Sequence, residues 1–133
     1  MRLRANIPRM PEARRNWHSD VAIDDGTDCS KVRLTCWIPL MDAGPDSGGL
    51  EIVPGRRAAP FTHRNEGAGL YSIPDATLTD VPRAQPFCPV GSVIFLDSFT
   101  PHRGLPNISG RERWSLVIWF RAEKAAATAV AAE

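Results

Sequence analysis

Proline and glycine are spread along the whole chain, and their spacing restricts the fold more than any other feature of the sequence. The 133 residues include 12 prolines and 10 glycines. Proline removes a backbone donor and glycine weakens a helix interior, so a chain interrupted this often favours short strands and turns over long helices. The apolar segments are accordingly short, rich in β-branched and aromatic residues, and bounded by turn residues.

These apolar segments read as the strands of an all-β domain. The clearest candidates are residues 2–7, 32–40, 50–53, 93–96 and 114–120. Weaker candidates are residues 17–23, 69–73 and 77–81. Several short strands with turn signals between them are typical of a sandwich or barrel. Residues 54–89 are the least regular part, and we expect long loops with short strands there.

The length of the chain predicts a single domain. We expect this domain to occupy residues 1–121 and to be followed by an Ala-rich tail, residues 122–133, that is helical or disordered.

The charge and composition favour a protein that acts on small molecules. The 16 basic and 15 acidic residues nearly cancel, so we expect neither nucleic acid nor a membrane surface as a partner. No apolar run reaches the length of a membrane span or resembles a signal peptide, and the three cysteines include no CxxC pair. A reducing, cytoplasmic location is therefore expected. The Arg-rich residues 2–15 are expected to be a solvated edge strand and loop.

An imidazole and a carboxylate lie two positions apart in the segment NWHSD. In an extended chain His18 and Asp20 would project to the same face. A third ligand must come from elsewhere, and His102, which follows residues 93–96, is the candidate. Two histidines and one carboxylate leave three octahedral positions open, which suits the oxygen chemistry of non-haem iron(II). The alternative is a surface loop with a local hydrogen bond, because so short a motif discriminates weakly.

A carboxylate receptor is predicted on the last apolar strand. Alternation places Arg113, Ser115, Val117 and Trp119 on one face. A guanidinium forks onto both oxygens of a carboxylate, and a neighbouring hydroxyl adds a further donor. A buried guanidinium without a partner is costly, so an inward Arg113 requires an anion. The alternatives are that Arg113 faces water, or that Arg111 takes its part.

Five ordered motifs resemble the phytanoyl-CoA dioxygenase family of iron(II)/2-oxoglutarate oxygenases. They are NWHSD, WIPL at the end of a strand, SGGLEIVPG, GSVIFLD, and a last histidine followed by PN and RWS. The resemblance runs from about residue 1 to about residue 121, and the middle loops are the least covered part.

This resemblance implies a double-stranded β-helix, also called a jelly-roll or cupin-like barrel, that is incomplete at its N-terminus and carries the metal at one mouth. It implies that His18, Asp20 and His102 bind Fe(II). It further implies that Arg113 pairs with the distal carboxylate of the co-substrate 2-oxoglutarate and that Ser115 assists it.

The resemblance also implies the reaction, a dioxygenase that uses O2 and 2-oxoglutarate to hydroxylate a small organic substrate, with release of succinate and CO2. Trp37 would line the pocket beside the co-substrate, and the alternative is that it fills the core. Gly48, Gly49 and Gly55 are expected to form turns rather than contacts. His63 is expected to face solvent on a loop.

The chain departs from the family pattern at several positions. Members are usually about twice as long, Arg57 stands where histidine is frequent, and Ser92 replaces a common aspartate. The short N-terminus leads us to expect an uncovered sheet edge or apolar face, and hence a homo-oligomer. Two other functions stay open: a zinc-dependent hydrolase that uses the same three ligands, and a non-catalytic jelly-roll module for binding or assembly.

Overall fold

The computed structural model describes residues 1–10, 15–22, 32–55, 57–68 and 70–121. Within these ranges the strands form three antiparallel sheets, and the only helical segments are short 3-10 helices. The large sheet has the strand order β1 (Arg2–Asn6), β8 (Arg113–Arg121), β2 (Val32–Pro39), β6 (Ile94–Asp97). The smaller sheets pair β3 (Leu50–Ile52) with β7 (His102–Gly104), and β4 (Arg64–Gly67) with β5 (Leu70–Ser72).

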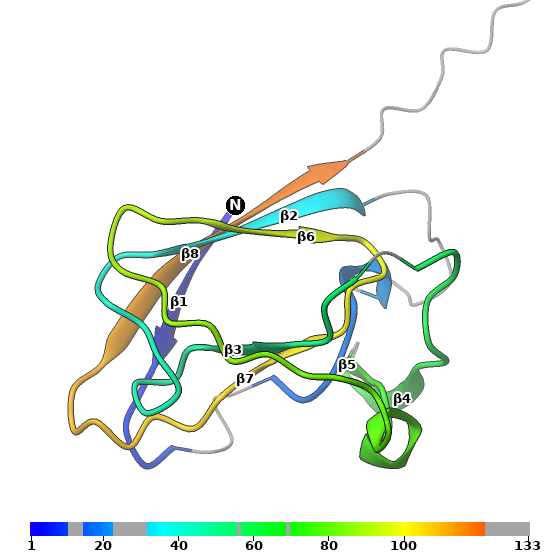
Figure 1. Ribbon diagram of the computed structural model, residues 1–133, viewed down its shortest axis with the longest axis horizontal. Coiled ribbons are helices and arrows are strands. Elements are labelled where there is room, and N and C mark those ends of the chain that lie inside the picture. Colours follow the sequence, from blue (N-terminus) through cyan, green and yellow to red (C-terminus); the bar gives the residue numbers. More distant parts are fainter. Residues whose placement is uncertain (11–14, 23–31, 56, 69, 122–133) are drawn as a thin grey trace, which may run out of the picture.

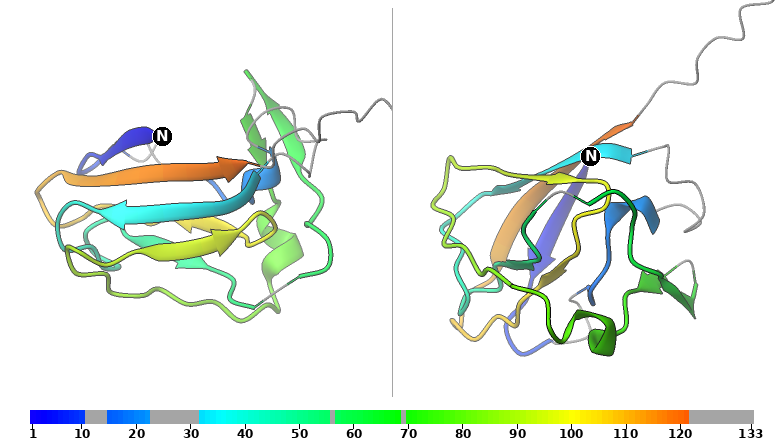
Figure 2. Two further views of the ribbon diagram at one scale, coloured as in Figure 1. Left: turned by 90° about the horizontal axis from the view of Figure 1, so that it is seen from above. Right: turned by 45° about the vertical axis from the view of Figure 1, so that its right-hand side comes forward.

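The β3–β7 pair lies opposite the large sheet and forms the second layer of the barrel (Figure 1). Isolated bridges widen this layer on both sides, with His18 beside His102 on β7 and Ala84 beside Ile52 on β3. Figure 2 shows β8, β2 and β6 running side by side, with β1 at the edge next to β8. The mostly β architecture confirms the predicted jelly-roll class.

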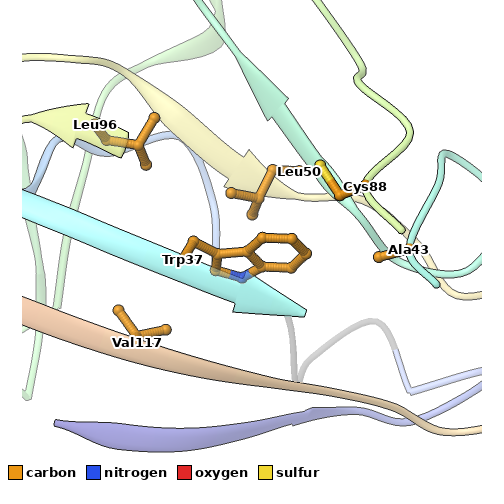
Figure 3. Packing of buried hydrophobic residues seen from close by; sticks show 6 residues of the cluster. All are labelled: Trp37, Ala43, Leu50, Cys88, Leu96 and Val117. Atoms are coloured by element: carbon orange, nitrogen blue, oxygen red, sulfur yellow. The ribbon is translucent and has the colours of Figure 1, made fainter. Parts of the chain in front are cut away.

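A hydrophobic core fills the space between the two layers. Its buried members are Trp37, Ala43, Leu50, Cys88, Leu96 and Val117 (Figure 3). Trp37 on β2 is the Cα partner of Val117 on β8, so both side chains project inward, toward Leu50 on β3.

Strand β8 follows the predicted alternation of faces. Ser115, Val117 and Trp119 on β8 line an internal cavity, whereas Phe120 on the same strand is 53 % exposed. Leu3 on β1 and Phe95 on β6 are also exposed.

The predicted homo-oligomer stays a prediction. A measurement of the molar mass in solution would test it.

The prediction of strands succeeded wherever the sequence alternates over several residues, and residues 69–73 indeed contain β5. It was wrong for residues 77–81, where the 3-10 helix η3 (Asp75–Leu78) follows Pro74 and turns Leu78 into the core. It was also wrong for residues 17–23, whose described part forms a single bridge and then the 3-10 helix η2 (Asp20–Ala22).

The short strands β4 and β7 were not predicted because their sequences, RNEG and HRG, contain no apolar alternation. Their backbones are extended by pairing rather than by local preference: β7 pairs with the distant strand β3, and β4 forms a hairpin with β5. The expected tail, residues 122–133, lies outside the described residues. No helix in the described part of the chain has both the length and the apolar character to span a bilayer.

A second apolar cluster packs behind the segment that carries His18. It consists of Trp17, Val53, Ile73 and Leu78, all at most 1 % exposed. This cluster anchors the loops after residue 53 to the barrel, because its members come from four separate segments of the chain.

We therefore expect Leu78→Ala to lower the free energy of unfolding by about 2–5 kcal/mol, through lost burial and the cavity left behind. Urea denaturation followed by tryptophan fluorescence measures this change. Leu70→Ala is the matched control, because Leu70 is 46 % exposed, and its effect should stay within about 0.5 kcal/mol. Equal effects of the two substitutions would contradict the assignment of this cluster as a core.

Candidate metal centre

Two imidazoles lie side by side where the segment around residue 18 pairs with β7. His18 and His102 form an isolated antiparallel bridge with reciprocal backbone hydrogen bonds of 3.0 and 2.8 Å. Directly paired residues project to the same face, and the two ring centroids are 4.3 Å apart. Both side chains are buried.

The Asp20 carboxylate completes a cluster with these imidazoles. Its Oδ1 lies 3.8 Å from Nε2 of His18 and 3.8 Å from Nε2 of His102. Local alternation is not the cause, because Asp20 begins the 3-10 helix η2. The turn of η2 nevertheless returns the carboxylate to the side on which His18 lies. The donor atoms of the three residues all lie within 4.8 Å of one another.

Backbone carbonyls set the tautomer of both histidines. Nδ1 of His18 donates to the carbonyl of Asn16 at 2.7 Å, and Nδ1 of His102 donates to that of Thr100 at 3.0 Å. In the neutral form of each ring the proton therefore lies on Nδ1, and Nε2 presents a lone pair toward Asp20. Burial, and next the neighbouring His102, lower the pKa of His18 to about 3, so its ring is neutral at physiological pH.

The other oxygen of Asp20 is already occupied by donors. Oδ2 accepts hydrogen bonds from the Thr35 hydroxyl and, at 3.2 Å, from Nε1 of Trp119. Burial alone would raise the pKa of Asp20, but the two imidazoles and these hydrogen bonds together lower it, which favours the carboxylate. Oδ1 therefore faces the two Nε2 atoms as an ionised oxygen. Two imidazoles and one carboxylate oxygen are a donor set that fits a divalent first-row metal ion.

His63 is part of this centre, contrary to the expectation of a solvent-facing loop residue. The backbone N–H of Ser19 donates to Nε2 of His63 at 3.0 Å, and the Ser19 hydroxyl lies 3.2 Å from the same atom. Because this N–H donates to it, Nε2 is the acceptor nitrogen of the ring, and burial lowers the pKa of His63. His63 thereby fixes the backbone between His18 and Asp20. No sequence signal pointed to this contact, because it joins residues 44 positions apart.

Arg113 lies in the same cavity as the three candidate ligands. Its side chain is buried, and burial lowers its pKa to about 10. Nη1 donates to the Ser115 hydroxyl at 2.7 Å, and Nε donates to the carbonyl of Gly48 at 2.9 Å, as does Nη2. Within the described ranges no carboxylate forms an ion pair with Arg113. Arg111, the alternative considered from the sequence, is exposed and borders a different surface depression.

Gly48 does more than form a turn, which corrects the expectation for this residue. Its φ of +74° is in the left-handed region, and an added Cβ would collide with the amide of Asn6. Its carbonyl accepts from both Arg113 and Asn6 Nδ2, the latter at 3.2 Å. Trp37 packs in the core and also lines the cavity, where the guanidinium carbon of Arg113 lies 5.2 Å from the centroid of its ring. Its place beside a co-substrate stays a prediction.

Two arginines of the basic N-terminal region also line the cavity. Arg4 and Arg15 are half-buried there rather than fully solvated, so the expectation of a solvated edge was wrong for these two residues. The sequence does contain a signal, because Arg4 alternates with Asn6 along β1 and shares its face.

A family comparison identifies the chain. The model of the family described as Phytanoyl-CoA dioxygenase (PhyH) matches residues 5–115. The chain belongs to this family. The membership confirms the resemblance seen in the ordered motifs. No curated protein sequence matches the chain.

Solved structures agree with membership of the PhyH family. EvdO2 from Micromonospora carbonacea var. aurantiaca, crystallised with 2-oxoglutarate, is 25 % identical with a TM-score of 0.71 over 93 % of this chain and 52 % of its own. AviO1 from Streptomyces viridochromogenes Tue57 is 26 % identical with a TM-score of 0.63 over 93 % of this chain and 49 % of its own.

A third structure shares the fold. The epimerase SnoN, crystallised with Fe3+, α-ketoglutarate and nogalamycin RO, is 24 % identical with a TM-score of 0.57, over 78 % of this chain and 40 % of its own. The chain thus spans about half the length of the solved structures it matches, or less.

We expect Thr35→Val to weaken divalent-metal binding by about 10–100-fold, the usual effect of losing a partner that orients a ligand. The substitution keeps the side-chain volume but removes the donor to Oδ2 of Asp20. Calorimetric titration with Mn2+ measures the affinity. Thr77→Val is the control, because Thr77 is exposed and distant in sequence from the cluster. An unchanged affinity in Thr35→Val would show that the hydroxyl does not orient a metal ligand.

Proposed function

We propose that this PhyH-family chain carries the metal and co-substrate sites of an Fe(II)- and 2-oxoglutarate-dependent dioxygenase. The reaction proposed is hydroxylation of a small organic substrate with O2, coupled to conversion of 2-oxoglutarate into succinate and CO2. One observation carries the proposal. A single cavity contains both the cluster of two imidazoles and a carboxylate and a buried guanidinium without an anionic partner among the described residues.

His18, Asp20 and His102 are the proposed iron ligands. Iron(II) held by such a set supplies open coordination positions for a chelating keto acid and for dioxygen. The protein contributes the protonation states, because Nδ1 of each histidine is held by a carbonyl and Oδ2 of Asp20 by two donors. The three ligand atoms are therefore oriented before a metal arrives.

Arg113 and Ser115 are the proposed anchors of the distal carboxylate of 2-oxoglutarate. The guanidinium is desolvated, so a charge-assisted bond to a carboxylate would be stronger there than at the surface. Trp37, stacked near the guanidinium, would form one wall of the co-substrate site. This arrangement separates the two ends of the co-substrate, with the keto-acid end at the metal and the distal end at Arg113.

The same ligands in a zinc hydrolase would need a general base beside the metal. Among the described residues that line the cavity, the only carboxylate is Asp20, whose Oδ2 already accepts two hydrogen bonds. A hydrolase would also have no use for Arg113. The cavity therefore favours the oxygenase over the hydrolase.

Anaerobic reconstitution with Fe(II) and 2-oxoglutarate tests the proposal. We expect a visible charge-transfer band from the wild-type chain and its loss in His18→Ala. Arg113→Ala should weaken 2-oxoglutarate binding by about 10–100-fold, because it removes hydrogen bonds to a charged group. Arg111→Ala is the matched control and should bind like the wild type, since Arg111 is exposed and outside the cavity. Succinate released after oxygen is admitted measures turnover.

Two results would contradict the proposal. Metal binding that is indifferent to 2-oxoglutarate would favour the zinc hydrolase. No metal binding by a folded chain would favour a non-catalytic binding or assembly module.

A further inference from the structure

Arg4 and Arg15 bring two positive charges to the cavity that the proposed co-substrate site does not use. Both side chains line the cavity and both are half-buried. Neither forms an ion pair with any carboxylate in the part of the chain that the structure describes. Half-buried guanidinium groups that form no ion pair lose part of their hydration, so the pair is suited to an anion.

The two arginines reach the cavity from opposite layers of the barrel. Arg4 lies on β1, the edge strand of the large sheet, and is the Cα partner of Ser115, so its side chain projects to the cavity face. The carbonyl of Arg15 accepts a hydrogen bond of 3.3 Å from Gly104 of β7, in the second layer. An anion between Arg4 and Arg15 would therefore be held from both sides.

Arg4 and Arg15 differ from Arg113 in the charges that act on them. Burial is the main cause that lowers the pKa of Arg4 and of Arg15, and the positive charge of Arg4 lowers the pKa of Arg15 further. The negative charge of Asp20 acts in the opposite direction on both. The pKa of Arg113 is lowered by burial alone. Arg4 and Arg15 thus share the electrostatic surroundings of Asp20, whereas Arg113 is fixed at the carbonyl of Gly48.

2-Oxoglutarate has two carboxylates, and the proposed function already gives each a partner. One chelates the metal and the other pairs with Arg113. The positive charges of Arg4 and Arg15 near Asp20 are therefore available to bind another molecule. Arg2 adds to them, since its guanidinium carbon lies 5.7 Å from the ring of Trp119, which itself donates to Asp20.

We propose that Arg4 and Arg15 form a second anion site that holds a carboxylate or phosphate group of the substrate next to the metal centre. This inference rests on the proposed function, because it assigns the substrate class of the same cavity. The substrate is accordingly an organic acid or a phosphate ester. Its anionic group fixes which C–H bond faces the metal, since the cavity offers two guanidinium forks to orient it.

Titration of the full chain with inorganic phosphate and, separately, with acetate tests the inference. Calorimetry is performed on the metal-free protein and again after saturation with Mn2+ and 2-oxoglutarate. We expect the wild type to bind at least one of the two anions in both states. Arg4→Gln and Arg15→Gln should each raise the Kd of the bound anion about tenfold, which is the effect of one lost charge-assisted contact. Tighter binding of phosphate would identify a phosphate ester as the substrate, and tighter binding of acetate an organic acid.

Three controls separate the anion site from folding and from the co-substrate. Arg33→Gln removes an exposed arginine of β2 and should leave the Kd within about twofold. The double variant Arg4→Lys/Arg15→Lys keeps the charge and should bind more tightly than Arg4→Gln/Arg15→Gln. The urea unfolding midpoint of each variant verifies that it is folded. The 2-oxoglutarate affinity of the double glutamine variant should fall less than that of Arg113→Ala, because Arg4 and Arg15 affect the co-substrate only through longer-range electrostatics.

The inference is overturned if the wild type binds neither anion, or if the double glutamine variant binds them as the wild type does. It is also overturned if saturation with 2-oxoglutarate displaces the anion, because the arginines would then serve the co-substrate. Wild-type protein that binds the anion through Arg4 and Arg15 but shows no metal-dependent 2-oxoglutarate binding would refute the proposed function alone and leave the anion site standing.

Discussion

The reciprocal backbone hydrogen bonds between His18 and His102 are the constraint on which the candidate site depends. They tie the segment before η2 to β7 and so widen the second layer of the barrel. Because the two residues are directly paired, their imidazoles are neighbours without any further contact. Asp20 then needs only the short turn of η2 to reach them. One bridge between distant parts of the chain thus brings together the donor set of the cluster.

Some polar atoms of the three clustered side chains have hydrogen-bond partners in the protein, and others do not. The Nδ1 atoms of both histidines and the Oδ2 atom of Asp20 have protein partners. The atoms that remain, two Nε2 lone pairs and one carboxylate oxygen, converge on one point. Buried polar atoms without partners are costly, so such a convergence is expected where a ligand supplies the missing interaction. The Arg113 guanidinium in the same cavity differs, because its nitrogens donate to Gly48 and Ser115, and only its charge has no anionic partner among the described residues.

The sequence predicted the parts of the fold that are governed by local periodicity. The long strands β2 and β8, the inward face of β8 and the proximity of Arg113 to Ser115 all follow from alternation. The cluster of His18, Asp20 and His102 was anticipated from residue chemistry and from family motifs, although the alternation invoked for Asp20 gives way to a 3-10 helix.

What the sequence did not predict are contacts made by residues far apart in the chain. His63 reaches Ser19 across 44 positions, and the carbonyl of Gly48 reaches Arg113 across 65. Alternation along β1 indicates the face of Arg4, but the sequence does not show that Arg15, which lies outside the strands, reaches the same cavity. The contacts of His63 and Gly48 cannot be read from the neighbouring sequence, because a loop histidine or a backbone carbonyl has the same sequence context whether it faces solvent or a site.

The carbonyl of Gly48 has a consequence for ligand binding that concerns entropy. A free arginine side chain has about 2 kcal/mol of rotamer entropy, which an ordinary ligand would have to remove when it binds. In this chain the guanidinium of Arg113 is already held on two of its nitrogens by one backbone oxygen and on the third by Ser115. The immobilisation therefore takes place during folding, and the proposed co-substrate would meet a guanidinium that is already held in place.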